Sequence, residues 1–441
     1  MESWDLVVVG AGCSALRAAI QASDSGATPI VIDGSGVGSA SGAPPVAGLA
    51  ASIDELDSNS HRDDTISLGG ESTDTDAADR ICGEGVSTLA ELERWGLVLR
   101  RRKGGLPHAS NAPWHNSARL TGCGDSTVRE VVRILEEQLI KRGIQRRSDL
   151  VPISLVSDNQ QVRGITVLDT ITGELMAIQA KAVILATEGH QGLWNSPAEG
   201  SGTGSALALG AGLELKGMQF HPKHPLTIRG YNIHIPFEVL GEGGRIRRES
   251  GEDVGPEEVL EGESCVLDLR HMPPESKPWF SQTTSRVSER LGVDISKDVL
   301  PIEAGFAVTT GGIPTDEFGR VVFDGFTPEG LPGKMWFTGL YAAGRSSNNG
   351  MHGQSLLPGN LMLDDLVSGK AAGGHSAGWI EGCSFGGGEN ISAELKNAEK
   401  LISDLHSESG LSIGQASTKL ASAMKSACAT NGSSNPSAAT S

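Results

Sequence analysis

The chain has 441 residues and a formal net charge of −18; 38% of its residues are hydrophobic and 59 are glycine. This length allows two or three structural units with a large core, and the acidic balance argues against nucleic acid or an anionic membrane as a partner. No stretch approaches the ~18–20 consecutive apolar residues that a membrane-spanning helix needs.

A strand, a glycine-rich turn, a helix and a second strand open the chain. The nearly all-apolar run Asp5–Val9 is typical of a strand that is buried on both faces of a parallel sheet. The turn Gly10–Ala15 follows at once, Leu16–Ser23 is expected to be a helix, and Pro29–Ile32 a second strand that ends at Asp33. A unit of about thirty residues suits a right-handed β-α-β crossover.

The rest of the chain predicts further helices, a ribbon of strands and a separate cap. Residues 34–52 are rich in Gly, Ser, Ala and Pro and are expected to form a loop that lines a ligand. We expect helices at Asp76–Trp95 and Ser126–Arg142, strands at Ile153–Val156, Val162–Asp169, Glu174–Ala180, Ala182–Leu185 and Met335–Gly344, and tail helices at Ala393–His406 and Ile413–Ala427. The stretch from Thr430 is expected to be disordered.

The predicted fold class is α/β, with a doubly wound, Rossmann-like dinucleotide-binding domain. Its two parts are expected over residues 1–215 and 306–375, because the later segment again has an apolar strand that ends in small residues, as the first part does. Residues 216–305, where His, Arg and Pro are interspersed, are expected to form an inserted α+β capping domain. Residues 376–441 would be a short helical tail with a disordered end.

The turn after the first strand carries the small residues of a dinucleotide-binding fingerprint. Gly10 permits the tight turn, Gly12 lets a pyrophosphate approach the backbone, and Ala15 lets the helix pack closely on the strand. Asp33 lies where a carboxylate accepts hydrogen bonds from a ribose diol, and the phosphates would meet the N–H groups at the helix start. The expected cofactor contacts here are Gly10, Ala11, Gly12, Cys13, Ser14, Ala15 and Asp33. Neighbouring phosphates disfavour a thiolate at Cys13, which we interpret as a packing residue.

Two later segments are expected to contact the same dinucleotide. Ala186 and Thr187 follow a buried strand and would lie against the adenosine half. The strand Gly339–Gly344 ends in Ala-Gly, which is typical of the segment that closes over the flavin in two-part FAD domains. We also assign Val151, where the antiparallel strands begin, to the cofactor site.

The chain resembles the flavoprotein subunits of succinate dehydrogenase and fumarate reductase, together with L-aspartate oxidase. The matching motifs occur in the family's order over roughly residues 4–375. They are Ala180–Gly189, Gln219–Pro222, Gly241–Gly244, Gly311–Thr315, Gly339–Gly344, His352-Gly353 and Pro358–Asn360.

The resemblance implies an FAD-dependent oxidoreductase that transfers a hydride between a small organic acid and the flavin. A family His maps onto His221, and Glu238 lies one place out of register with the family's cap carboxylate. His352, near the expected flavin, is a third candidate catalytic residue. An electron-acceptor protein or O₂ would then reoxidise the flavin.

The same resemblance bears on how the cofactor is held. Arg345 stands where the family has a Glu that binds the FAD ribose, and Leu356 and Leu357 belong to a segment expected to lie against the cofactor. The family's attachment His falls near Ser41, another expected cofactor contact, and no His lies between Met1 and His61. FAD should therefore be held without a covalent bond, as in the aspartate oxidase branch.

The residues that bind a dicarboxylate in the family are largely replaced. Ala307 stands where the family has a substrate-binding His, and Leu356 stands where it has a clamping Arg. No counterpart of the Gly-Arg-Asp segment, which carries the proton-shuttling Arg, occurs between Gly251 and Leu267. Because each charge-assisted contact to a carboxylate contributes ~1.5–3 kcal/mol, succinate and fumarate should be poor substrates. Arg345, or the cluster Arg245, Arg247 and Arg248, would have to turn inward to substitute.

Other interpretations stay open. An L-aspartate oxidase-like enzyme would release peroxide with aspartate, although Ala307 and Leu356 argue against it. A catalytically degenerate FAD-binding protein would bind flavin without reduction by any acid. A metal at His221, His224 and His234 is set aside, because His next to Pro in an irregular loop is more often structural or substrate-facing.

The cysteines and the first residues bear on where the protein works. The cysteines are scattered without a CxxC pair, which favours neither a zinc site nor an iron–sulfur cluster and indicates a reducing compartment. The first core strand begins within a few residues of Met1, so no signal peptide is expected. We therefore expect a soluble cytoplasmic protein.

We predict that the purified protein is yellow and releases FAD when acid or heat denatures it. The reason is the combination of a dinucleotide turn at Gly10–Ala15 with the lack of a His near Ser41. The absorbance of the supernatant and of the precipitate after denaturation measures the outcome. Flavin that stays with the precipitated polypeptide would show a covalent bond, and a colourless protein that FAD cannot reconstitute would contradict the flavoprotein interpretation.

Overall fold

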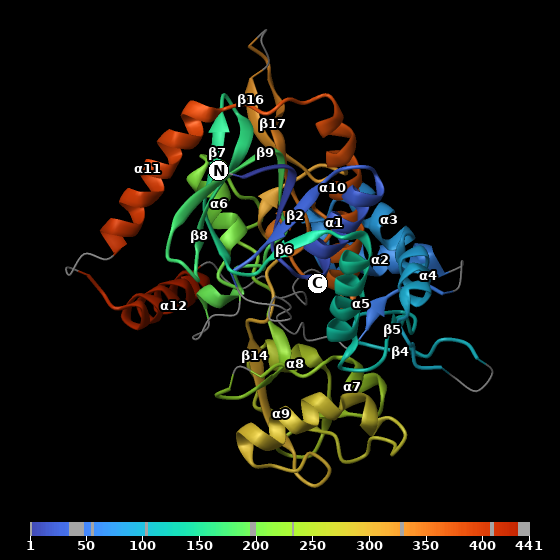
Figure 1. The fold of residues 1–441 in the computed structure, drawn as a ribbon. Helices are drawn as coiled ribbons and strands as arrows, with labels where there is room; N and C mark the ends of the chain where they lie inside the picture. The colour runs from blue at the N-terminus through green and yellow to red at the C-terminus, as the bar shows by residue number, and fades with distance from the viewer. Residues whose placement is uncertain are drawn as a thin grey trace.

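The computed structural model describes residues 2–34, 48–53, 57–101, 105–194, 200–231, 233–326, 330–405 and 410–430. A larger lobe is built around a twisted sheet, and a smaller lobe, drawn in yellow-green and yellow, lies below it (Figure 1). Helices α11 (Gly388–Leu405) and α12 (Ile413–Thr430) lie at one side of the larger lobe. Among the described residues, no helix is long and apolar enough to cross a bilayer.

The large sheet combines a parallel part with an antiparallel ribbon. Its strands are β1 (Glu2–Val9), β2 (Pro29–Ile32), β6 (Gln145–Arg147), β7 (Leu150–Asp158), β8 (Gln161–Asp169), β9 (Leu175–Leu185), β16 (Arg320–Phe326) and β17 (Pro332–Ala342). From one edge, β6, β2, β1, β9 and β17 run parallel, while β7, β8 and β9 pair antiparallel, as do β16 and β17. This architecture confirms the predicted doubly wound α/β class.

At two places the predicted division into elements is wrong. The strands expected on either side of Lys181 form the single strand β9, which pairs with β1 without interruption on both sides of Lys181, while the Lys181 ammonium pairs with Asp5 at 2.8 Å. The helix expected over residues 76–95 is instead α3 (Thr75–Gly83) followed by α4 (Gly85–Trp95). The break falls between two glycines, which are weak helix formers.

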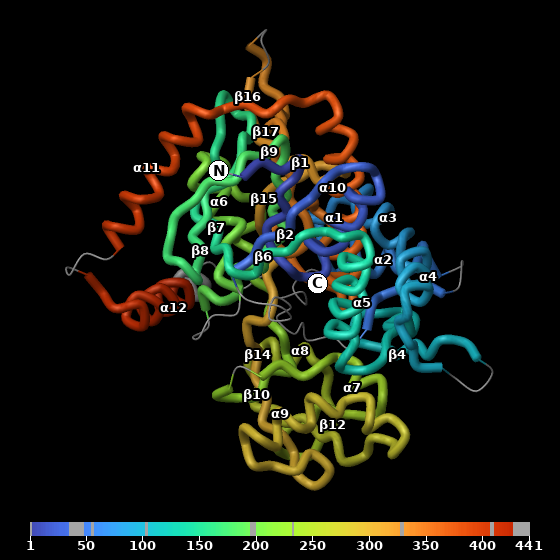
Figure 2. The backbone as a smooth tube through the Cα atoms, in the orientation of Figure 1, coloured from blue at the N-terminus to red at the C-terminus, as the bar shows by residue number. Residues whose placement is uncertain are grey.

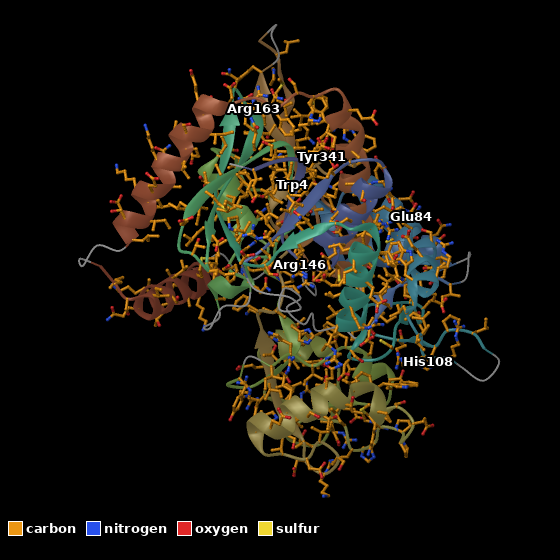
Figure 3. The ribbon with its side chains drawn as sticks, viewed as in Figure 1. Trp4, Glu84, His108, Arg146, Arg163 and Tyr341 are labelled. Carbon is orange, nitrogen blue, oxygen red and sulfur yellow. The ribbon has the colours of Figure 1, made fainter. Side chains whose placement is uncertain are left out.

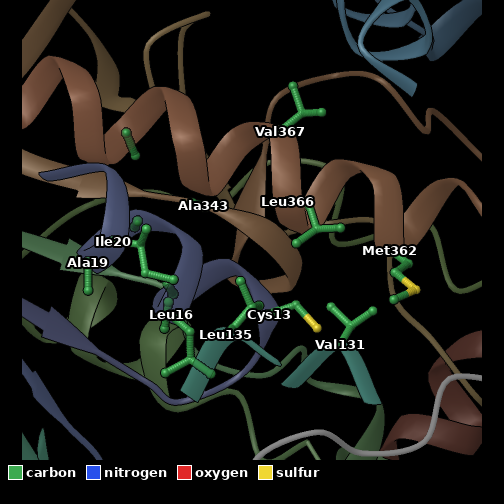
Figure 4. Close-up of a cluster of buried hydrophobic side chains, with 14 of the residues drawn as sticks. Cys13, Leu16, Ala19, Ile20, Val131, Leu135, Ala343, Met362, Leu366 and Val367 are labelled. Atoms are coloured by element: carbon green, nitrogen blue, oxygen red, sulfur yellow. The ribbon is translucent and has the colours of Figure 1, made fainter. Parts of the chain in front are cut away.

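Helices α1 (Cys13–Asp24), α5 (Thr127–Arg142) and α10 (Asn360–Glu381) cover one face of the sheet. Helices α1 and α10 approach so closely that glycine is required at their contact. A Cβ on Gly369 would lie 2.4 Å from the Ser14 carbonyl oxygen, and one on Gly373 would lie 2.1 Å from that of Ala18. Beside this contact, apolar side chains from all three helices interdigitate, among them Leu16, Leu135 and Leu366 (Figure 4).

The opposite face of the sheet has a core of its own. Helix α6 (Thr203–Gly210) contributes Leu207 and Ala208 to it, beside strand residues such as Val183. Helix α11 reaches the outer side of the antiparallel ribbon, where Ile391 packs against Val156. Strand-rich and helix-rich layers therefore enclose the parallel strands from both sides.

The small lobe is a second sheet covered by short helices. It consists of β10 (His224–Ile228), β11 (Arg245–Arg248), β12 (Asp253–Val254), β13 (Cys265–Asp268), β14 (Leu300–Gly305), α7 (Glu238–Gly241), α8 (Pro256–Leu260) and α9 (Ser281–Leu291). A separate cluster of buried residues, including Leu226, Leu267 and Ile302, fills it. The chain enters this lobe in green and returns along β14 to the larger lobe (Figure 2).

Short elements connect the two lobes and the helix layer. They are α2 (Asp57–Gly69), β3 (Leu49–Ala50), β4 (Ala109–Ser110), β5 (Leu120–Thr121), β15 (Ile313–Pro314) and β18 (Ser347–Asn348). Strand β15 pairs in parallel with β18, and β3 and β4 both pair with β5.

A buried ion network anchors α2 and the start of α10. Arg119 is 0% exposed and holds Asp57 with two nitrogens, at 2.8 and 3.0 Å, and Asp64 with a third at 2.6 Å. It also donates to His115 Nδ1, so the His115 Nε2–H donates to the Pro358 carbonyl oxygen at 2.9 Å. Residues far apart in the sequence are thereby fixed just before α10 begins.

We predict that Arg119→Met lowers the free energy of unfolding by about 3–5 kcal/mol, because Asp57 and Asp64 lose their shared buried cation. Arg133→Met is the matched control, since Arg133 pairs with carboxylates on the exposed side of α5. The urea concentration at the midpoint of unfolding, determined for each FAD-bound variant, measures the loss of stability. Equal midpoints for the two variants would contradict the assignment of a structural role to the network.

Candidate functional site

The carboxyl ends of the parallel strands meet at one edge of the large sheet, where the predicted dinucleotide residues gather. The Gly10 N–H donates to Ile32 at the end of β2, and the Ala186 N–H donates to Val9 at the end of β1, both at 2.9 Å. The Ala343 N–H donates to Leu185 at the end of β9 at 3.0 Å. In doubly wound folds, ligands bind at this edge.

The first turn of α1 has the features of an anion site. Gly12 caps the helix without a side-chain hydrogen bond, so its first N–H groups face outward without a side-chain partner. The buried Ser14 hydroxyl has no hydrogen-bond partner within the described ranges. Burial raises the pKa of the Cys13 thiol to about 12, so it stays neutral beside a bound anion.

Asp33 and Val151 lie together beside this turn. Arg146 donates to the Asp33 carboxylate at 3.2 and 3.3 Å and also pairs with Glu136 of α5 (Figure 3). Val151 packs against the residue after Asp33, since a Cβ on Gly34 would lie 2.4 Å from its Cγ2. Two of the expected cofactor contacts, Asp33 and Val151, are thus brought together.

Gly344 and Arg345 lie at the end of β17, next to α1 and α10. Gly344 has φ +64° and donates its N–H to Ser368 at 2.9 Å. The Arg345 guanidinium lies 3.4 Å from the buried Asp365 carboxylate. Burial raises the Asp365 pKa to about 6, although Arg345 opposes the shift. Arg345 therefore already has a carboxylate partner.

These features fit the two phosphates of a dinucleotide. Gly10 and Gly344 let the backbone pack closely, since a Cβ would lie 2.2 Å from the Ala186 carbonyl oxygen at Gly10 and 2.6 Å from the Ser14 Cβ at Gly344. Helix α1 begins beside the Ser14 hydroxyl, which has no partner among the described residues. Thr187 accepts the Gly204 N–H at 2.8 Å and so ties the end of β9 to α6. Ser41 lies outside the described residues.

A small cavity lies between the segment 217–221, the segment 309–312 and the loop 347–353. Phe220, Thr310, Asn348 and His352 are among its lining residues. The segments are held close by backbone pairing, since the Lys216 and Gly312 N–H groups and carbonyls exchange two hydrogen bonds of 2.9 Å. Residues of the His221 and His352 motifs therefore border one space.

His352 forms a pair with Asp364 and keeps one ring nitrogen free. Its Nε2 lies 3.1 Å from the Asp364 Oδ2. A carboxylate only accepts hydrogen bonds, so this nitrogen carries the proton and Nδ1 offers a lone pair. His352 is only 8% exposed. Its Nδ1 is buried and has no hydrogen-bond partner among the described residues. This is the arrangement of a proton acceptor that a carboxylate orients.

Two further buried polar groups near the cavity were not predicted. The Thr310 hydroxyl, in a residue that is 6% exposed, and both His190 ring nitrogens lack partners in the described part of the chain. Burial, helped by the proximity of His221, lowers the His190 pKa to about 4. The only sequence signal for His190 is its place directly after the Ala186–Gly189 segment.

His221 belongs to an aromatic stack. Its ring centroid lies 5.7 Å from that of Trp194 and 6.0 Å from that of Phe306, and those two rings stack at 5.2 Å. Burial lowers the His221 pKa, so a neutral imidazole is favoured. The Lys223 ammonium lies 5.8 Å from the Phe306 ring. His224, by contrast, is buried inside the small lobe, His234 is half-buried next to it, and no group that could bind a metal occurs among the described residues.

Glu238 lies apart from the cavity lining. It is 0% exposed and begins α7, between the core residues Phe237 and Val239 of the small lobe. Glu238 and Glu242 both act electrostatically on the buried Arg100. The catalytic role of Glu238 stays a prediction.

The two positions that lack the family's charged clamp share one apolar cluster. Ala307 and Val308 pack with Leu361, and the partly buried Leu356 packs against them. Leu357 is itself buried. The cluster, termed here the apolar wall (Ala307, Val308, Leu356 and Leu361), adjoins Thr310 and His352 along the chain.

The arginines of the small lobe are already paired. Arg245 and Arg247 both bind Asp253, at 3.0 and 2.7 Å. Arg247 also binds Asp268, and Arg248 binds two glutamates at 2.7 Å each. The hypothesis that this cluster turns inward to replace the clamp is therefore not supported by its geometry.

Comparisons with known proteins agree with a dinucleotide site at the sheet edge where the parallel strands end. Residues 5–362 match the model of the FAD-binding domain family. An uncharacterised FAD-dependent oxidoreductase from Methanocaldococcus jannaschii is 28% identical over 437 residues, which cover 92% of this chain and 77% of that protein. The mitochondrial succinate dehydrogenase flavoprotein subunit of Oryza sativa is 27% identical over 417 residues, which cover 84% of this chain and 65% of that subunit.

A solved structure has the same fold. The FrdA chain of a variant of E. coli quinol fumarate reductase superposes with a TM-score of 0.85 at 24% sequence identity. The match covers 97% of this chain and 79% of that chain. The chain described here is thus shorter than the relatives that it matches.

We predict that Gly10→Ala weakens FAD binding by more than about tenfold, whereas Gly26→Ala does not. Both glycines have positive φ, at 118° and 94°, so both substitutions carry backbone strain. Only at Gly10 would the new Cβ meet another atom, the Ala186 carbonyl oxygen at 2.2 Å, while nothing lies within 4 Å at Gly26. Titration of each apoprotein variant with FAD, followed by fluorescence, measures the two affinities. Equal affinities of the two variants would contradict the assignment of the Gly10 turn to the FAD site.

Proposed function

The chain belongs to the FAD-binding domain family and is an FAD-dependent oxidoreductase, and on that premise we propose that it oxidises or reduces a small organic acid at noncovalently held FAD. Bound FAD supplies the two-electron chemistry by accepting or giving a hydride. The protein's part is to bind the acid, orient it and carry the proton. In this proposal, residues 216–305 form the cap over the substrate.

The turn of α1 and the strand ends beside it are the proposed FAD site. The N-terminus of α1 with Ser14 would hold the pyrophosphate, and Asp33 with Val151 would lie at the adenosine half. Gly344 and the segment around Leu357 would lie toward the flavin. The lack of a His near Ser41 supports noncovalent binding.

One observation carries the proposed chemistry: His352 and Thr310 line the same cavity, and the His352 Nδ1 and the Thr310 hydroxyl have no hydrogen-bond partner among the described residues. Asp364 holds the opposite nitrogen and therefore fixes the tautomer and the direction of the ring. Nδ1 would take a proton from the substrate carbon during oxidation and return it during reduction. Thr310 would donate a hydrogen bond to a substrate oxygen.

His221 is the second proposed reacting residue. Its lowered pKa leaves the ring neutral, and the stack with Trp194 and Phe306 restrains its position. A neutral imidazole can donate with one nitrogen and accept with the other, so His221 suits either binding or proton transfer. Its neighbour Phe220 lines the same cavity as His352.

Anaerobic mixing of the FAD-bound protein with candidate acids tests the proposal directly. Loss of flavin absorbance with an acid, and its recovery when the reduced protein meets the unsaturated acid, would support it. Reoxidation by O₂ is then compared with reoxidation by an electron-acceptor protein. Peroxide release with L-aspartate would instead favour an aspartate oxidase-type reaction, and flavin that no acid reduces would favour a degenerate FAD-binding protein.

We predict that His352→Gln slows reduction of the flavin by its substrate about 10²–10⁴-fold and leaves FAD occupancy intact. Glutamine keeps a polar group near Asp364 but cannot accept the proton. His271→Gln is the control, because His271 lies exposed on the small lobe. Stopped-flow absorbance measures both rates. An unchanged rate in His352→Gln would remove His352 from the chemistry.

A further inference from the structure

We infer that the substrate carries one polar head and an apolar end, and that the apolar end packs on the apolar wall formed by Ala307, Val308, Leu356 and Leu361. The inference rests on the proposed function and names its substrate class. That class is a short monocarboxylic acid with a hydrocarbon tail, in contrast to a dicarboxylic acid.

The apolar wall joins two segments that both border the cavity. Ala307 and Val308 precede Thr310 on one segment, and Leu356 follows His352 on the other. Leu361 closes the contact between them and is buried. Leu356 is only partly buried, and in this inference its exposed part is the surface that a hydrocarbon group of the substrate covers, because burial of apolar surface is favourable.

Each of the same two segments also supplies one unpaired polar atom. The Thr310 hydroxyl and the His352 Nδ1 are buried and lack partners within the described ranges. Buried polar groups in native proteins are nearly always hydrogen-bonded, so two unpaired groups in residues of one cavity indicate a ligand between them. The Thr310 hydroxyl can donate to an oxygen of a single head group, whereas the His352 Nδ1 has a lone pair and, in the proposed function, accepts a proton from the substrate carbon beside that head group.

The charge distribution disfavours a second carboxylate. In the part of the chain that the structure describes, no Lys, Arg, Asp or Glu is among the residues that line this cavity. Arg345 is committed to Asp365, and Arg119 to Asp57 and Asp64. An ionised carboxylate placed against Leu356 would lose its hydration without a compensating cation.

Lys223 offers a balancing charge for one head group only. Its ammonium lies over the Phe306 ring, beside His221, with a centroid distance of 5.8 Å. This places one cation near the aromatic stack and none in the apolar wall. The asymmetry matches a molecule with one anionic end.

Crotonate and fumarate form a matched pair of probes, because they differ only by a methyl group in place of one carboxylate. Both are already oxidised, so neither reacts with oxidised FAD, and titration calorimetry of the FAD-bound protein measures binding alone. We expect crotonate to bind at least about tenfold tighter than fumarate. Leu356→Arg should reverse that order, whereas Leu356→Met, which keeps an apolar side chain of similar size, should preserve it.

The outcomes separate the inference from the proposed function. Tighter binding of fumarate to the unaltered protein would overturn the inference and leave the proposed function standing. Binding of neither acid, together with failure of both butyrate and succinate to reduce the flavin, would overturn both. Tighter binding of crotonate that Leu356→Arg does not diminish would also overturn the inference, because the tail would then lie elsewhere.

Discussion

Close backbone contact around helix α1 is the constraint on which the site depends. Gly10 brings the start of α1 against the end of β9, and Gly369 and Gly373 bring α10 against its side. At each of these positions a Cβ would lie within 2.4 Å of a carbonyl oxygen, closer than van der Waals contact allows. The N-terminus of α1, the proposed site of the FAD phosphates, therefore has a fixed position relative to both neighbours.

The same packing places the substrate side of the site. Helix α10 begins at Asn360, directly after the segment that carries His352 and Leu356, and it also carries Asp364, which orients His352. The Arg119 network adds a second anchor, through His115 and the Pro358 carbonyl oxygen. Contacts to α1 and to Arg119 thus fix the position of the segment that carries His352, the proposed proton acceptor.

Local patterns allowed the opening β-α-β unit and most strands to be predicted. The run Asp5–Val9 and the turn after it are informative by themselves, because parallel strands and dinucleotide turns have strong local signatures. Helix α10 received no prediction, since the glycines that permit its contact with α1 each lower helix propensity by ~1 kcal/mol. Helix α2 is mostly polar, and its place follows from ion pairs with Arg119, which no periodicity reveals.

In the candidate site, too, some features follow from local sequence and others only from contacts between distant residues. Motif order predicted His221 and His352, but the roles suggested for Thr310 and Asp364 depend on burial and on which atoms are left unpaired. Neither property can be read from sequence. Charge alone made it reasonable to expect that arginines replace the missing clamp. That expectation is not supported, because Arg345 and the small-lobe arginines have nearby carboxylates that sequence distance conceals.

The apolar wall helps to decide between an altered enzyme and a degenerate one. Loss of function without selection would be expected to leave a hole or an unpaired charge where a His and an Arg had faced one substrate. Instead, Ala307 and Leu356 pack in one cluster with Val308 and Leu361. Meanwhile His352 keeps its Asp364 partner and an unpaired Nδ1 beside the cavity. A packed apolar cluster at these positions, together with the His352–Asp364 pair of the proposed proton acceptor, favours a change of substrate over a loss of chemistry.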